Sequence, residues 1–128
     1  MKRLTLMLGL LVLAAVTAAC SSTSGGNPPA PTGPVDPNAP VVVAQNNAFS
    51  PATVTVTSGK AFSLTLDNKD GAPHNVSIYT DSGASTSISA GEIVSSTTTT
   101  QQVPALAKGT YFFRCDVHHE MTGTVVAQ

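Results

Sequence analysis

Residues 41–128 consist of short stretches rich in Val, Ile, Thr and Phe that are separated by turn residues. Apolar and polar residues alternate within several of these stretches, most clearly in residues 53–57 and 62–66. A period of two residues is typical of a β-strand with one apolar face. Outside the N-terminus, no segment of ten or more residues repeats apolar side chains at the 3.6-residue spacing of a helix. The chain must therefore build its core from sheets.

We expect about seven or eight strands, because turn residues recur at the intervals typical of a sandwich. A single turn of helix around Leu106 is the only helical feature that the pattern allows. Without helical crossovers, two antiparallel sheets packed face to face are the favoured arrangement, an all-β sandwich. The expected strands include residues 41–43, 53–57, 62–66, 76–78, 97–100, 111–113 and 124–126.

The first nineteen residues have a composition unlike the rest of the chain. Lys2 and Arg3 give a positive end, an apolar run follows over residues 4–19, and the run closes on small residues before Cys20. This order is typical of a secretory signal peptide, which we assign to residues 1–19. A transmembrane anchor is the less favoured alternative, because a spanning helix needs about 20 apolar residues.

Cys20 directly follows the small residues and precedes a Ser/Gly-rich segment. This resembles a bacterial lipoprotein signal, in which the cysteine becomes the lipid-modified first residue of the mature chain. Thr17 stands where that family usually has an aliphatic residue, so cleavage nearby by ordinary signal peptidase is the alternative. The resemblance implies an exported protein that is anchored through Cys20 on the periplasmic or extracytoplasmic face of a membrane.

Residues 20–40 are predicted to combine this anchored cysteine with a flexible tether. Residues 21–40 contain six of the nine prolines and almost no large apolar side chains. Such a segment cannot bury enough surface to offset the entropy of ordering it. We therefore expect one folded domain, residues 41–128.

The net charge and the number of cysteines limit the functions that the chain can have. Without residues 1–19 the chain has four Lys/Arg against seven Asp/Glu, a net charge of −3. A nucleic-acid partner is not expected, because it would require a clustered basic face. Once Cys20 is lipidated, Cys115 is the only thiol, and disulfides are the usual fate of cysteine in exported proteins. A lone thiol therefore needs another role, and metal ligation is one.

Residues 115–121 concentrate the side chains that bind metals. Cys115, His118, His119 and Met121 lie in this segment, between two expected strands, and His74 is the only other histidine. Thiolate and thioether are soft ligands and imidazole is borderline, so two His, one Cys and a weak Met are the ligand set of a blue-copper centre.

Other interpretations of these residues stay open. Zinc accepts Cys with two His, but it gains little from a thioether. Calcium and magnesium need more oxygen ligands than Asp116 and Glu120 offer. Without a metal, the cysteine would be a buried structural thiol, the methionine a core residue and His74 a solvated loop residue.

Residues 111–126, Tyr-Phe-Phe-Arg-Cys-Asp-Val-His-His-Glu-Met-Thr-Gly-Thr-Val-Val, with His-Asn-Val upstream, resemble the small type I copper proteins of the plastocyanin and amicyanin kind, the cupredoxins. Cys-x2-His-x2-Met is the short, amicyanin-like loop. The resemblance covers residues 41–128 and implies a Greek-key β-sandwich with one copper ion that alternates between Cu(I) and Cu(II). It also implies three strong ligands, His74, Cys115 and His118, and one axial ligand, Met121.

Asn75 and His119 each lie directly after one of these ligands in the sequence. Asn75 resembles the asparagine of the family whose side chain links the two ligand-bearing loops, although a capped turn is an alternative role. His119 stands where the related proteins usually have Pro. Both adjacent histidines suit copper, so the choice of His118 over His119 rests on loop spacing.

Four protein ligands leave no open position for a substrate, so we expect a one-electron carrier at the cell surface or in the periplasm and not an enzyme. Its partners would be a redox donor and a redox acceptor, and we expect a monomer. A copper storage, delivery or tolerance protein would use the same residues, although delivery sites are usually richer in Met and His. A multicopper oxidase or nitrite reductase would need further histidines, and only His119 is spare.

Overall fold

The computed structural model describes residues 38–128. The predicted signal peptide, the lipidated Cys20 and most of the predicted tether lie outside this range. Nine strands make up the regular structure: β1 (Val41–Gln45), β2 (Ala48–Ser50), β3 (Thr53–Val56), β4 (Phe62–Asn68), β5 (Ser77–Tyr79), β6 (Ser87–Ala90), β7 (Thr98–Val103), β8 (Gly109–Arg114) and β9 (Thr122–Ala127).

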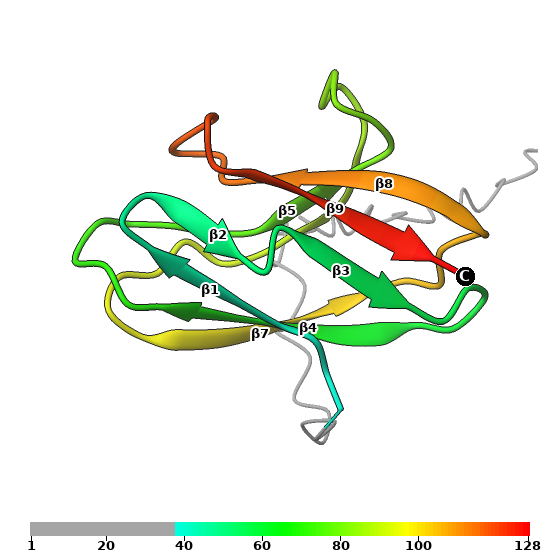
Figure 1. The fold of residues 1–128 in the computed structure, drawn as a ribbon, viewed down its shortest axis with the longest axis horizontal. Coiled ribbons are helices and arrows are strands. Elements are labelled where there is room, and N and C mark those ends of the chain that lie inside the picture. Colours follow the sequence, from blue (N-terminus) through cyan, green and yellow to red (C-terminus); the bar gives the residue numbers. More distant parts are fainter. Residues whose placement is uncertain (1–37) are drawn as a thin grey trace, which may run out of the picture.

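The strands form two sheets packed face to face (Figure 1). One sheet has the order β2-β1-β4-β7 and the other the order β3-β9-β8-β5-β6. The predicted all-β sandwich is therefore confirmed. None of residues 38–128 lies in a helix, so this part of the chain contains no helix suited to crossing a membrane.

The expectation of two purely antiparallel sheets is wrong, because each sheet contains one parallel pair. Strand β1 runs parallel to β4, and β3 runs parallel to β9. The chain leaves the first sheet after β2 and enters the second at β3, beside the last strand of the domain. Alternation of apolar residues shows which face of a strand is buried but not which strand lies beside it.

Apolar side chains from both sheets meet in one core. Phe49 on β2 packs against Phe113 on β8 with ring centroids 5.5 Å apart and a tilt of 55°. The predicted helical turn around Leu106 does not form. Leu106 instead lies in an irregular segment, where its side chain is buried in the core and its carbonyl accepts a hydrogen bond from the Gly59 N–H.

Strand β5 is buried on both of its faces. In the expected strand over residues 76–78, Val76 and Ile78 have the same parity and should share one face. Both are buried, but so are Ser77 and Tyr79, which belong to the opposite face. Polar groups on that second face must find hydrogen-bond partners within the protein.

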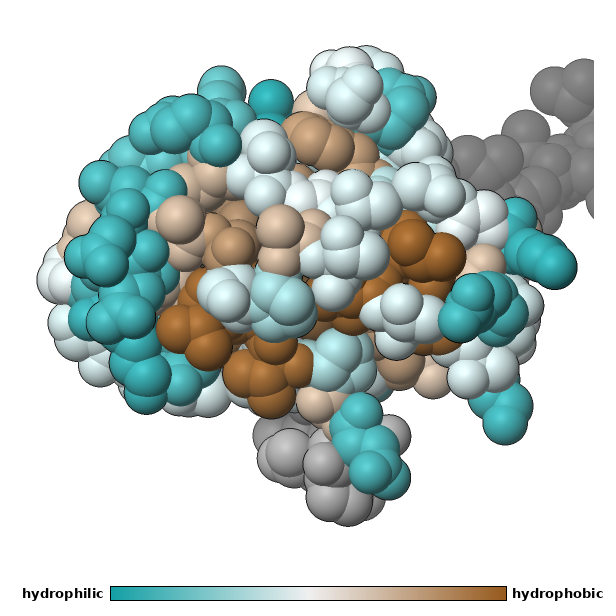
Figure 2. All heavy atoms as spheres, in the orientation of Figure 1, coloured by the Kyte–Doolittle hydropathy of each residue, from teal (hydrophilic) through white to brown (hydrophobic). Residues whose placement is uncertain are grey.

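The two ends of the sandwich carry different segments of the chain. The loop between β8 and β9 lies at one end, and the C-terminus lies at the other (Figure 1). The chain enters the fold at Pro40, whose carbonyl accepts a hydrogen bond from the Thr65 N–H at 3.0 Å. Figure 2 shows hydrophilic residues gathered over the loop end, at the left, and hydrophobic residues nearer the middle of this face.

The close packing of β8 on β9 gives a test of the fold. Gly123 lies opposite Phe113, and a Cβ added to it would overlap the buried phenyl ring. We expect Gly123→Ala to lower the free energy of unfolding by about 1–3 kcal/mol, the usual cost of overpacking a core. Urea unfolding measures the change.

Gly71→Ala is the matched control, because a Cβ at Gly71 has no atom within 4 Å. We expect it to leave the free energy of unfolding within about 0.5 kcal/mol of the original. Equal stability of the two variants would contradict the packing described for β8 and β9.

Candidate metal centre

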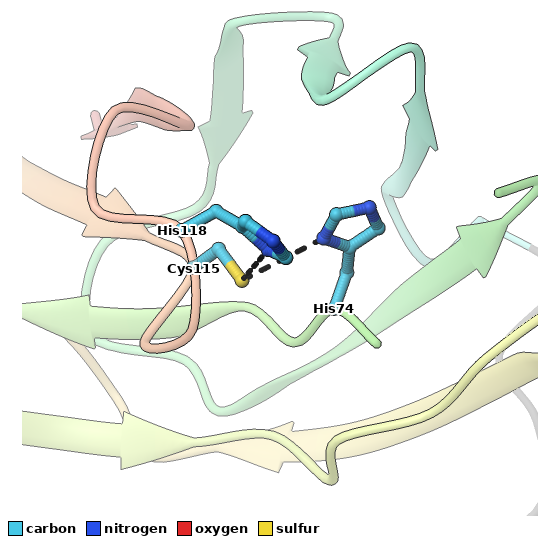
Figure 3. A group of neighbouring side chains, drawn as sticks. All are labelled: His74, Cys115 and His118. Atoms are coloured by element: carbon cyan, nitrogen blue, oxygen red, sulfur yellow. Dashed lines mark hydrogen bonds between the residues drawn. The ribbon is translucent and has the colours of Figure 1, made fainter. Parts of the chain in front are cut away.

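Three side chains that can bind a metal converge at the loop end of the sandwich (Figure 3). His74 Nδ1 lies 3.8 Å from Cys115 Sγ, and His118 Nδ1 lies 3.9 Å from the same sulfur. The two imidazole rings meet edge to face, with centroids 4.8 Å apart. His74 and Cys115 are fully buried, whereas His118 is half-buried.

These separations fit a single metal ion. Metal–sulfur bonds of about 2.3 Å and metal–nitrogen bonds of about 2.0–2.1 Å, about 120° apart, place the sulfur and nitrogen atoms about 3.8 Å from one another. The observed sulfur–nitrogen distances are 3.8 and 3.9 Å. The donor set therefore fits a trigonal site, and residues 38–128 contain no other group of metal-binding His, Cys and acidic side chains with comparable spacing.

The hairpin of β8 and β9 positions Cys115, His118 and Met121. The paired strands end at Arg114 opposite Thr122, so residues 115–121 form the connecting loop. Within it, the Cys115 N–H donates to the Met121 carbonyl at 3.0 Å, and the Met121 N–H donates to the His118 carbonyl at 2.9 Å. The side chain of Met121 is buried. These bonds fold the loop tightly, so one short segment carries all three residues and brings His118 next to Cys115.

His74 comes from a separate segment. Its backbone pairs with Val94 through two hydrogen bonds, in an isolated bridge outside the named strands. Its Nε2 lies 3.2 Å from an oxygen of the Asp70 carboxylate. Since its other ring nitrogen faces Cys115, this contact fixes the orientation of the ring.

Asp70 is itself held by the turn between β1 and β2. Asn46 and Asn47 form a two-residue turn with φ angles of 54° and 56°, as a type I′ hairpin requires. Their N–H groups donate to the Asp70 carboxylate at 2.9 and 3.1 Å. These bonds, chiefly that from Asn47, lower the pKa of Asp70. A surface turn thus contributes to the orientation of His74.

The two adjacent histidines occupy different positions. His118 is the one whose ring nitrogen faces Cys115. His119 is exposed, and its Nε2 lies 3.1 Å from the Asp116 carbonyl. The imidazole of His119 therefore contacts the backbone of the loop and does not join the group of three.

Asn75 links the two segments that carry the site. Its Oδ1 accepts the Asp116 N–H at 2.8 Å, and its Nδ2 donates to the Asp116 carboxylate at 2.9 Å. The register of β5 and β8 explains the contact. Because Ser77 pairs with Arg114, continuing the same register places Asn75 opposite Asp116. The side chain of Asn75 is buried, as such a link requires.

The role of Asp116 was not predicted from the sequence. Its carboxylate accepts hydrogen bonds from Asn75, Ser77 and Tyr79, which share one face of the β5 segment. Burial alone would raise the pKa of Asp116, but the bonds from Ser77, Tyr79 and Asn75 outweigh it and lower the pKa. The available signal was the polar alternation of Asn75, Ser77 and Tyr79, which places three hydrogen-bond donors on one side of this segment.

Comparison with known proteins adds the family to this geometry. A family model described as a cupredoxin-like domain matches residues 9–127. No match to a protein of curated function was found.

Solved structures resemble the fold at low sequence identity. The dithionite-reduced auracyanin of the photosynthetic bacterium Roseiflexus castenholzii has a TM-score of 0.62 and 20% identity, with 69% of this chain and 94% of auracyanin covered. Amicyanin from Paracoccus versutus has a TM-score of 0.58 and 22% identity, with 74% and 86% covered. The Cu(I) form of an amicyanin mutant has a TM-score of 0.58 and 24% identity, with 74% and 87% covered.

Proposed function

The chain belongs to the cupredoxin-like domain family, and on this premise we propose that it is a mononuclear type I copper protein that carries one electron at a time. We propose that His74, Cys115 and His118 would be the strong ligands and Met121 the weak fourth ligand. The observation that carries the proposal is the placement of both imidazoles 3.8–3.9 Å from one buried thiol. A bound copper ion would supply the Cu(II)/Cu(I) couple, and this soft, mixed ligand set suits both oxidation states.

The protein holds these ligands in place by itself. Asp70 orients His74, the Cys115–Met121 backbone bond closes the loop, and the Asn75–Asp116 link fixes the two segments relative to one another. Preorganised ligands need little rearrangement when the charge of the ion changes. Small rearrangement favours fast electron transfer, which is the property required of a carrier.

The exposed edge of His118 is the proposed route for the electron. His118 is the only half-buried member of the group of three, and the neighbouring Val117 is 44% exposed. A donor and an acceptor protein would each contact this edge in turn, the first supplying the electron and the second removing it. An apolar residue beside the edge would allow close approach without costly desolvation.

We place the domain outside the cytoplasm, on a tether anchored by a lipidated Cys20. Pro40 joins β1 beside Thr65, while the site lies beyond the other ends of β1 and β4. Five residues of β1 at about 3.3 Å each separate the entry point from the site end by roughly 16 Å. The attachment therefore leaves the His118 edge accessible to soluble or membrane-bound partners.

Copper delivery is the alternative use of the same site. It is disfavoured because the chain has no tract rich in Met or His, and His119 is the only further histidine. The lack of further histidines also weighs against an oxidase or a nitrite reductase, because either would need a second copper centre.

Adding Cu(II) to the purified protein tests the proposal directly. We expect an intense visible absorption from the thiolate–Cu(II) bond that disappears on reduction and returns on reoxidation. Cys115→Ser should abolish this absorption, because the hydroxyl cannot replace the soft thiolate. A colourless product that retains only Cu(I) would favour copper delivery over electron transfer.

The adjacent histidines provide a matched pair of variants. We expect His118→Ala to lose the visible absorption, because one of the three strong ligands is gone. His119→Ala should leave the wavelength and intensity of the absorption unchanged, since its ring faces the Asp116 carbonyl. Visible spectra of the two Cu(II) proteins measure this, and the reverse result would show that His119 is the ligand.

The proposed anchor is tested by Cys20→Ser. In a bacterial host, we expect the original protein in the membrane fraction and the variant in the soluble or uncleaved form, because no lipid can attach to serine. Fractionation and mass spectrometry of the intact chain measure both effects. An unmodified N-terminus on the original protein would contradict lipidation and favour ordinary signal peptidase.

A further inference from the structure

A polar cluster surrounds the residue that follows Cys115. Asp116 receives hydrogen bonds from Asn75, Ser77 and Tyr79, and Arg114 Nε lies 3.8 Å from one of its oxygens. The Arg114 guanidinium also lies over the Tyr79 ring, 5.1 Å from its centroid. The β5–β8 register places these side chains on one face of the sheet, beside the metal-binding loop.

We propose that Asp116 is a positioning residue that sets the reduction potential of the copper centre. Its carboxylate fixes the loop against the β5 segment, and its negative charge, held next to Cys115, stabilises Cu(II) relative to Cu(I). This inference rests on the proposed function. It assigns to Asp116 a role beyond that of the four ligands and Asn75.

The charge is held in a place where water screens it incompletely. The Asp116 side chain is 32% exposed, and both of its oxygens accept hydrogen bonds. Three hydrogen-bond donors point at these two oxygens, and such donors favour the ionised form of a carboxylate. A fixed negative charge one residue from the thiolate opposes reduction, since reduction adds negative charge to the site.

The neighbours of Asp116 moderate this charge. The cation of Arg114 offsets part of it, and the hydroxyls of Ser77 and Tyr79 disperse it through hydrogen bonds. Removing a moderating group should therefore change the potential in the direction opposite to removing the carboxylate. A purely structural cluster has no reason to show opposite signs.

The test compares four variants of the full chain by spectroelectrochemical titration at pH 7. We expect Asp116→Asn, which keeps the shape of the side chain, to raise the potential and shift the Cu(II)/Cu(I) equilibrium about tenfold toward Cu(I). Arg114→Gln and Tyr79→Phe should lower the potential. Glu120→Gln removes an exposed charge from the same loop and should change it least.

Unfolding of the metal-free variants provides a readout that does not depend on copper. If Asp116→Asn does not fold, Arg114→Gln and Tyr79→Phe still test the sign, because both retain the carboxylate. The inference is overturned if Asp116→Asn matches Glu120→Gln, or if all variants shift the potential in one direction. Failure of the original protein to form a coloured Cu(II) complex would instead overturn the proposed function, and this inference with it.

Discussion

Two hydrogen bonds between Asn75 and Asp116 join segments that lie 41 residues apart in the chain. One segment carries His74 and the other carries Cys115, so the spacing of imidazole and thiol depends on this contact. Both residues continue the antiparallel register of β5 and β8, which the sheet has already fixed. Strand pairing therefore sets the geometry of the site, and the loop between β8 and β9 carries the side chains that meet His74.

The same register determines the chemistry of the two faces of the β5 segment. One face carries Val76 and Ile78 into the core, where Ile78 lies opposite Phe113. The other carries Ser77 and Tyr79 to the carboxylate of Asp116. A partly buried carboxylate without donors would be costly, and buried hydroxyls without acceptors would be costly too. Here the hydroxyls donate to the carboxylate, so each group has a hydrogen-bond partner, and these bonds hold the loop against β5.

Local patterns in the sequence predicted the all-β sandwich and the segments of most strands, because period-two alternation follows directly from burying one face. They did not predict the parallel pairs, since β1 meets β4 and β3 meets β9 only after the chain has crossed between sheets. The local patterns also did not predict the short strands β2 and β6. The grouping of His74 with the Cys115 loop was expected from residue types and family resemblance. The roles of Asp70 and Asp116 depend on contacts that no local pattern specifies.

Cys115 is the only thiol in residues 38–128, and its side chain is inaccessible to solvent. Oxidants and foreign thiols attack cysteines that they can reach, so burial protects this sulfur during the interval between folding and metal loading. In the oxidising compartment proposed for this protein, an exposed lone thiol would be lost to mixed disulfides or sulfenic acid. His118, by contrast, is half-buried, so in the proposed copper centre it is the ligand that an incoming ion could reach from solvent. Protection of the sulfur and access for the proposed metal are thus assigned to two different residues of one short loop.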